Sequence, residues 1–403
     1  MNFFKQVDID WMGKAKYFFA LSLTLLVIGG ASLVAHGGPY YGIDFKGGTV
    51  VDVRFATPPP VDTIRNGLSQ QGMNNFTIVP VSDIASPNSN EVLINLEEKG
   101  EGSEALDAGK TAILNALHTT LGSGEAGKQD FNAAGASEVS DVLTRKDPLS
   151  LGAAAGNRYT QLASQLVDYR DRNRRGIVTN LNDLASAGAS AAVISALRDS
   201  FYTSNFAIIN VEIVGPKVGS ELRRQAVVVT LYALGGMLVY IAFRFEWVYG
   251  AAAVLAVFHD VLITLGLFSI FHFEISLTVI AALLTLVGYS MNDTIVIFDR
   301  IRENTRLMRR EPFPAIVNRS INQTLSRTIL TSGLTFLTVL VLFLMGGQVL
   351  RAFSFALVVG ILVGTYSSFG IAAPLVVAWN HWRGQGASLA VSGTAAGNKL
   401  RKT

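Results

Sequence analysis

The sequence predicts a polytopic α-helical membrane protein with an α+β domain between its first two membrane helices. Of its 403 residues, 50% are hydrophobic and 16% are charged, which is too apolar for a soluble protein. Six apolar runs are long enough to span a bilayer. After the first run, the periodicity indicates elements in the order β-α-β-β-α-β, which is typical of a ferredoxin-like fold.

The composition excludes several classes of function. The chain has no cysteine, so it has neither disulfides nor thiolate metal sites. Its five histidines are scattered and form no HExxH or similar motif, and no nucleic-acid-binding motif occurs. We therefore expect no metal, no cofactor, no catalytic residues and no nucleic-acid partner.

The chain begins with a short polar stretch, residues 1–16, which we expect in the cytoplasm. Residues 17–35 then form an apolar run that can cross about 30 Å of hydrocarbon as a helix. A signal peptide is the alternative interpretation. The length of the run and the lack of a small-x-small cleavage site favour an uncleaved anchor.

Residues 36–224 form the predicted extracytoplasmic domain. A glycine-rich turn, GIDFKGGT at 42–49, precedes a strand in which hydrophobic and polar residues alternate. The expected strands and helices of the ferredoxin-like order are Val50–Phe55, Val61–Gly72, Phe76–Val81, Glu91–Leu96, Ala105–Thr119 and Phe206–Val214.

An insertion rich in Ala, Gly and Ser, about residues 122–203, separates the last two of these elements. It carries no chemical signal. Helices are expected at Ala136–Thr144, Asn157–Arg175 and Ala189–Phe201. Near the end of the second helix arginines alternate with acidic residues, which indicates a solvated face. These arginines are Arg170, Arg172, Arg174 and Arg175.

Residues 225–382 contain the other five spans, and residues 383–403 read as a disordered cytoplasmic tail. The short connection between the fourth and fifth spans is rich in arginine, which places it in the cytoplasm. Its arginines before Arg327, which opens the fifth helix, are Arg300, Arg302, Arg306, Arg309, Arg310 and Arg319. Both termini are then cytoplasmic and the large domain is outside. The five spans are Ala226–Phe243, Val248–Phe271, Ile275–Phe298, Thr328–Met345 and Ser354–Trp379.

Three charged residues lie in or beside the spans: Asp260, Asp293 and Arg327. A carboxylate within an apolar helix costs at least ~2.5–3.5 kcal/mol on insertion scales, so it normally faces a bundle interior. Each charge lies on the most polar stripe of its own helix, and we expect these stripes to meet inside the bundle. The stripes contain Ala256 and Thr264; Thr278, Thr285 and Tyr289; and Gln323, Thr331, Thr335 and Thr338.

Several interpretations of these charges remain open. The first is a proton or cation relay, and the second is intramembrane aspartyl proteolysis, in which two aspartates share a proton. The sequence lacks the Gly-x-Gly-Asp context expected of the protease. A structural polar network is the third, and Asp293 could also reach the membrane surface by snorkelling. His259 could shuttle protons for Asp260 or pack against a neighbour.

Small residues recur at four-residue steps on two spans. Gly288 and Asn292 lie on the fourth, and Gly360, Gly364 and Ser368 on the sixth. Such stripes permit close helix approach. We expect the second stripe to bind a partner subunit, with ordinary packing inside the chain as the alternative.

Taken together, six motifs resemble the SecF family of protein-export membrane proteins, within the SecD/SecF group of the resistance-nodulation-division superfamily. The resemblance covers about 1–100 and 205–382. The insertion at 122–203 is longer than the family pattern leads us to expect. The motifs are GIDFKGGT at 42–49, VGPKVGSEL at 214–222, HD at 259–260, GYSMNDTIVIFDRIREN at 288–304, INQTLSRTILTS at 321–332 and FSFALVVGILVGTYSS at 353–368.

The resemblance implies a half-bundle of six helices in the bacterial inner membrane. It also implies a non-enzymatic role in late protein export, driven by the proton motive force. Asp293 and Arg327 match the residues implicated in proton passage, with Asp260 as a third. The implied partners are SecD in a SecDF complex, SecYEG, SecA, YajC or YidC, an unfolded secretory polypeptide and membrane lipids. An exporter of small molecules or lipids from the same superfamily is the alternative.

Overall fold

The structure of the protein is a computed structural model that describes residues 8–81, 90–97, 103–121, 127–152, 155–244 and 246–382. The chain divides into two compact units. One comprises Met1–Gly42 with Arg223–Thr403, and the other comprises Ile43–Leu222. The expected disordered tail at 383–403 lies outside the described residues.

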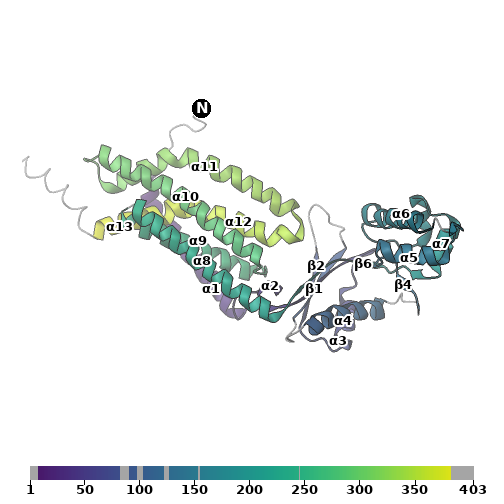
Figure 1. Ribbon diagram of the computed structural model, residues 1–403. Coiled ribbons are helices and arrows are strands. Elements are labelled where there is room, and N and C mark those ends of the chain that lie inside the picture. Colours follow the sequence, from purple (N-terminus) through teal and green to yellow (C-terminus); the bar gives the residue numbers. More distant parts are fainter. Residues whose placement is uncertain are drawn as a thin grey trace, which may run out of the picture. The chain divides into compact units, whose positions relative to one another are not determined.

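Six helical segments of the described chain are long and apolar enough to cross a membrane, which confirms the predicted number (Figure 1). The sixth segment is interrupted by a π-helical turn, η4. The segments are α1 (Trp11–Ala35), α8 (Pro216–Arg244), α9 (Trp247–Ile270), α10 (Leu277–Leu307), α11 (Phe313–Met345), and α12 (Gly347–Ser367) with η4 (Ser368–Ala372) and α13 (Ala373–Trp382).

Helix α1 begins at Trp11, six residues before the apolar run on which the prediction relied. Asp10 caps it by accepting a hydrogen bond from the Gly13 N–H at 2.9 Å. Asn318 of α11 donates to the same Asp10 oxygen at 2.7 Å. The helix therefore extends through polar sequence because its first turn is capped and bound to another helix.

The second unit contains the predicted ferredoxin-like fold. Its four-stranded sheet has the order β2-β3-β1-β6, and every neighbouring pair is antiparallel. This is the arrangement that the β-α-β-β-α-β sequence predicts. The elements are β1 (Gly48–Phe55), α3 (Val61–Gln70), β2 (Phe76–Val81), β3 (Glu91–Leu96), α4 (Ser103–Leu121) and β6 (Phe206–Val214).

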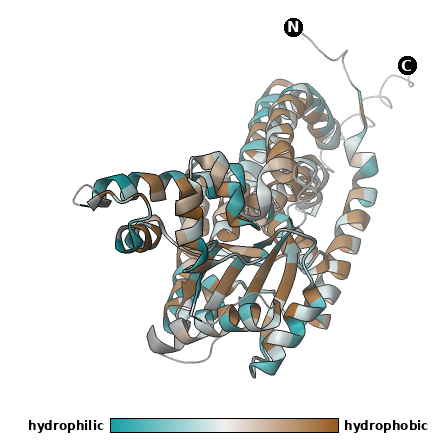
Figure 2. Cartoon of the chain, turned by 90° about the vertical axis from the view of Figure 1, so that its right-hand side faces the viewer, coloured by the Kyte–Doolittle hydropathy of each residue, from teal (hydrophilic) through white to brown (hydrophobic). Residues whose placement is uncertain are grey.

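One face of this sheet is hydrophobic and packs against α3 and α4. Val51 and Val53 alternate toward it and are fully buried, as are Leu68 of α3 and Leu117 of α4. Figure 2 shows the hydrophobic character of these strands in brown. Burial of one face explains why the alternating pattern of β1 was readable in the sequence.

The glycine-rich turn before β1 allows very close backbone contacts. After the short helix α2 (Ile43–Lys46), Gly47 and Gly48 adopt φ values of 79° and 143°. A side chain on Gly47 would lie 2.6 Å from Pro216 Cα, at the start of α8, and one on Gly48 would clash with the Leu96 carbonyl. The first and second sequence motifs therefore contact each other, and only glycine fits at these two positions.

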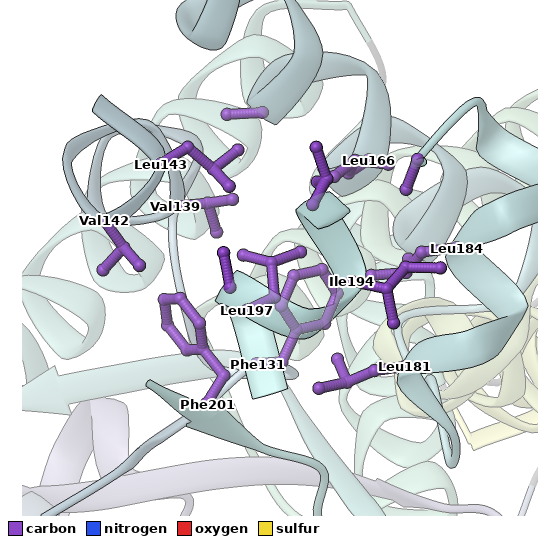
Figure 3. Packing of buried hydrophobic residues seen from close by; sticks show 14 of the residues in the cluster. Phe131, Val139, Val142, Leu143, Leu166, Leu181, Leu184, Ile194, Leu197 and Phe201 are labelled. Atoms are coloured by element: carbon purple, nitrogen blue, oxygen red, sulfur yellow. The ribbon is translucent and has the colours of Figure 1, made fainter. Parts of the chain in front are cut away.

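The insertion has a hydrophobic core of its own. Phe131, Leu143, Leu197 and Phe201 are buried together in it (Figure 3). Its elements are β4 (Gln129–Asp130), α5 (Ala136–Lys146), α6 (Ala155–Asp168), the π-helical η2 (Tyr169–Asn173), the 3-10 helix η3 (Leu181–Ala187), α7 (Ala191–Arg198) and β5 (Phe201–Tyr202), and β4 pairs in parallel with β5.

One prediction for the insertion was wrong. Arg170 is not on a solvated face but is only 8% exposed. Its guanidinium donates hydrogen bonds to the carbonyls of Phe131 and Ala134 at 2.8 and 2.7 Å, and it pairs with Asp171. The π-helical turn at this point turns Arg170 inward, and helical periodicity in the sequence gives no sign of such a turn.

Asp52 lies on the other face of the sheet, which leads to a prediction about pH. Burial, together with Glu91 and Glu212, raises its pKa from 3.8 to about 6 despite Arg54 nearby. The folded domain therefore holds this proton more tightly than the unfolded chain does, and stability falls as pH rises from about 4 to about 6.

We expect Asp52→Asn to raise the melting temperature of the full-length protein at about pH 8 but to change it little at about pH 4. Thermal denaturation followed by circular dichroism at both pH values measures this. Asp62→Asn, on the exposed surface of α3, is the control. Equal effects of Asp52→Asn at both pH values would contradict the assignment.

Candidate functional site

Asp260 is completely buried among the membrane helices, with 0% of the residue exposed. Its Oδ2 accepts hydrogen bonds from Ser290 Oγ of α10 at 2.6 Å and from Ser367 Oγ of α12 at 2.9 Å. Its Oδ1 lies 2.8 Å from His259 Nδ1. The carboxylate thus joins three helices by hydrogen bonds.

Asp293 occupies a second buried polar position, at 3% exposure. Its Oδ2 accepts a hydrogen bond from Ser332 Oγ of α11 at 2.7 Å. The adjacent Thr294 shares a hydrogen bond of 2.9 Å with Ser368, in the π-helical turn of the sixth span. Each of the two aspartates therefore has its own hydrogen-bond partners, which differs from the shared proton that an aspartyl protease requires.

The structure does not bring Arg327 and Asp293 together as an ion pair. Within the described ranges, no Lys or Arg nitrogen lies within 4.0 Å of the Asp293 carboxylate. Arg327 is exposed on the surface of α11, within electrostatic reach of Asp293. The expectation that the Arg327 stripe faces the bundle interior was therefore wrong.

Another polar stripe of α11 faces inward instead. Ser320, Thr324, Thr328 and Ser332 recur at four-residue steps and are all buried. Thr331, which the sequence analysis selected, is exposed, and its hydroxyl bonds the Arg327 carbonyl of its own helix at 3.0 Å. The small hydroxyl side chains fit a close helix contact, whereas a guanidinium needs water, a headgroup or a partner.

The stripe of Gly360 and Gly364 was predicted to bind a partner subunit, and this prediction was wrong. A side chain on Gly364 would lie 2.9 Å from Ser290 Cβ, and one on Gly360 would clash with Leu286. Both glycines therefore pack inside the chain, between α12 and α10, and not against a partner.

The stripe of Gly288 and Asn292 on α10 is not covered by another helix of the described chain. Among the described residues, no atom of a packing neighbour lies within 4 Å of a Cβ added at Gly288, and Asn292 is exposed. Tyr289 is half-buried, and its hydroxyl has no hydrogen-bond partner among the described residues. These three residues contribute no polar contact to Asp293.

Three serines that complete the site were not predicted from the sequence. Ser290, Ser332 and Ser367 bind the two aspartates, and each lies in a motif noted above. Gly29 of α1 and Gly266 of α9 mark another close crossing, where a side chain on either would lie 2.7 Å from the other's Cα. A search for Ser, Thr and Gly at four-residue steps could have found the α11 serines.

No group of three or more His, Asp or Glu able to hold a metal occurs in the described ranges.

Six membrane helices around buried carboxylates, with a ferredoxin-like domain after the first, define a half-bundle of the resistance-nodulation-division type. Comparison with known proteins gives the family. The model of the protein export membrane protein SecD/SecF C-terminal region matches residues 193–382, and that of the SecD/SecF GG motif matches 33–59. The chain belongs to the SecF family of protein translocase subunits.

Individual relatives agree with this assignment. The chain is 51% identical over 403 residues to the protein translocase subunit SecF of Koribacter versatilis, covering 98% of this chain and 97% of the relative. It is 38% identical to SecF of Calditerrivibrio nitroreducens, over 92% and 93%. The crystal structure of Thermus thermophilus SecDF, a translocon-associated membrane protein, matches with a TM-score of 0.63 and 33% identity. That match covers 93% of this chain and 39% of the SecDF chain.

Proposed function

We propose that this SecF-family subunit uses the proton motive force to assist late steps of protein export across the bacterial inner membrane. Its partner would be SecD, and the pair would act with SecYEG, SecA and YajC or YidC on an unfolded secretory polypeptide. The names of the relatives support the translocase role. The single observation that supports proton use is the pair of carboxylates buried between membrane helices.

The proposed mechanism depends on the unfavourable free energy of an ionised Asp293 carboxylate inside the helix bundle. In the part of the chain that the structure describes, an ionised carboxylate there has one hydroxyl donor, Ser332, and no cation in direct contact. A proton arriving from outside neutralises it, and this weakens the attraction of Asp293 for Arg327 across the bundle surface. α10 and α11 then shift relative to each other. A potential of about 100 mV supplies ~2.3 kcal/mol per charge moved, so several protons per cycle are needed for a large movement.

Translocation into inverted membrane vesicles tests this function. Vesicles depleted of the protein and vesicles with it restored are compared, with and without an uncoupler, at saturating ATP. Restoration should accelerate export only while the proton gradient exists. Equal acceleration after uncoupling would exclude proton-driven assistance.

The partner surface is proposed on the open stripe of α10. Thr285, Gly288 and Asn292 are exposed at steps of three and four residues, and Arg327 is exposed on α11. A second half-bundle could cover these residues and supply a polar counterpart for Arg327. This replaces the surface around Gly360 and Gly364, which is already occupied by α10.

We expect Gly288→Leu to reduce recovery of SecD strongly in affinity purification of this subunit, because leucine prevents close helix approach. The control is Gly236→Leu on α8, which also has open space around it. Quantitative mass spectrometry of the purified complexes measures the ratio of the two subunits. Equal loss in both variants would mean that bulk alone, and not this stripe, affects assembly.

The proposed orientation places both termini and the arginine-rich connection after α10 in the cytoplasm, and the Ile43–Leu222 domain outside. Arg302 and Arg306 lie in the last turns of α10, a helix longer than the bilayer thickness, and Arg309 lies in the turn that follows it. The chain has no cysteine, so a thiol reagent can label this protein only at a single engineered cysteine.

We expect a membrane-impermeant thiol reagent to label Ser69→Cys in intact spheroplasts, because Ser69 is exposed in α3. Arg309→Cys should react only after the membrane is opened. The reverse pattern would invert the topology.

A further inference from the structure

Asp260 is one of the two buried carboxylates, but the mechanism above gives no role to His259 beside it. His259 has only 10% of its side chain exposed, and its Nδ1 lies 2.8 Å from Asp260 Oδ1. Its other ring nitrogen, Nε2, is buried and has no hydrogen-bond partner in the described part of the chain. A buried imidazole nitrogen without a partner is costly, and it needs an explanation.

The groups in contact with this pair come from α10 and α12, and one of them is bound in turn to α1. Ser290 approaches from α10, and Ser367 approaches from α12. The Tyr366 ring, also on α12, meets the His259 ring edge to face at 6.0 Å. The Tyr366 hydroxyl in turn shares a hydrogen bond of 2.9 Å with Ser22 of α1. Across the described ranges, no Lys or Arg nitrogen lies within 4.0 Å of the Asp260 carboxylate.

This setting favours an uncharged pair. An isolated carboxylate in the bundle interior would lack a compensating cation. Two protons on the pair make it neutral overall, one on Nε2 and one between Oδ1 and Nδ1. The second proton can lie on either atom, as Asp with neutral His or as Asp⁻ with His⁺. Loss of the Nε2 proton leaves an anionic pair with the single proton between Oδ1 and Nδ1.

We propose that Asp260 and His259 form a second protonation site of the membrane bundle, in which one proton exchanges at His259 Nε2 and another is shared with the carboxyl group. It is separate from Asp293, because the two sites have different hydrogen-bond partners. Ser290 and Ser367 connect its charge state to α10 and α12. This deepens the proposed proton-driven function, on which its role in export rests, but the site itself can be tested without export.

Nitrogen NMR of the full-length protein in lipid bilayers, labelled with ¹⁵N-histidine, tests the site. Only five histidines occur in the chain, and loss of one signal set in His259→Gln assigns His259. We expect its ring resonances to change with pH, and Asp260→Asn to displace the Nδ1 resonance toward that of an ordinary neutral imidazole. Asp293→Asn should leave them unchanged.

If His259 has only a structural role, its ring resonances should respond neither to pH nor to the Asp260→Asn substitution. If the His259 resonances are constant with pH and identical in Asp260→Asn, the proposal is overturned. If Asp260→Asn does not fold, Ser367→Ala keeps both members of the pair and removes one donor to Oδ2. That variant should still displace the Nδ1 resonance, and an unchanged resonance would also overturn the proposal.

Export measurements separate this proposal from the proposed function. If His259 titrates as described but wild-type export does not respond to an uncoupler, the protonation site stands and proton-driven export fails. If export responds to the uncoupler while His259 never titrates, the site fails and the function stands. Where both hold, uncoupler-sensitive export should be lost in His259→Gln and retained in His381→Gln, at the exposed end of α13.

Discussion

Asp293→Asn should abolish the part of protein export that depends on the proton gradient, while the ATP-driven step of SecA persists. Asparagine keeps the size of the side chain and can still accept the hydrogen bond from Ser332. It cannot ionise, so it holds α10 permanently in the state of the neutral acid. We therefore expect folding and SecD binding to be intact.

Translocation into inverted vesicles, with and without an uncoupler, measures this effect. Wild-type vesicles should slow on uncoupling, whereas Asp293→Asn vesicles should already be slow and insensitive. Asp299→Asn is the matched control, because Asp299 lies on the same helix but is exposed and pairs with Arg244. Full, uncoupler-sensitive export by Asp293→Asn would make Asp293 a structural residue and leave Asp260 as the principal relay.

Gly364→Leu should destabilise the helix bundle itself, not only its assembly with a partner. A Cβ at this position would already lie 2.9 Å from Ser290 Cβ, and leucine adds three further carbons. Overpacking of a close contact typically costs ~1–3 kcal/mol, and more where two backbones meet. Displacement of Ser290 would also remove one hydrogen bond from Asp260.

The melting temperature of the purified subunit in detergent, followed by tryptophan fluorescence or size-exclusion chromatography after heating, measures this loss. Gly364→Ala should show a smaller decrease. Gly288→Leu, at an open position on α10, should leave the melting temperature of the isolated subunit near wild type. A normal melting temperature for Gly364→Leu combined with loss of SecD would return this stripe to the partner surface.

Most of the architecture could be predicted because it depends on local patterns. The apolar runs are longer than any soluble helix needs, and the alternation in β1 has a period of two. The six spans and the ferredoxin-like order follow from these patterns. The start of α1 was missed because its first turn is polar, and the contact that holds this turn comes from Asn318 of α11, over 300 residues away.

The buried face of α11 could not be predicted from the sequence alone. Helix α11 carries two polar stripes about one residue apart, one with Arg327 and one with Ser332. A difference of about 100° in direction decides which stripe is buried. The charged stripe was predicted to lie inside because an ion pair between Asp293 and Arg327 was expected. The structure buries the smaller hydroxyl groups and leaves Arg327 on the surface.

The sequence by itself determined the class of protein, the number of spans, the fold of the α+β domain and the presence of Asp260 and Asp293 in membrane helices. Only the tertiary structure decided that each aspartate has its own serine partners, that Gly360 and Gly364 pack inside the chain, and that His259 Nε2 has no partner among the described residues. The physical reason is that hydropathy and periodicity are summed along one element. Burial, close contact and hydrogen bonding depend on which face of that element meets another, and this is set by the packing of all the helices together.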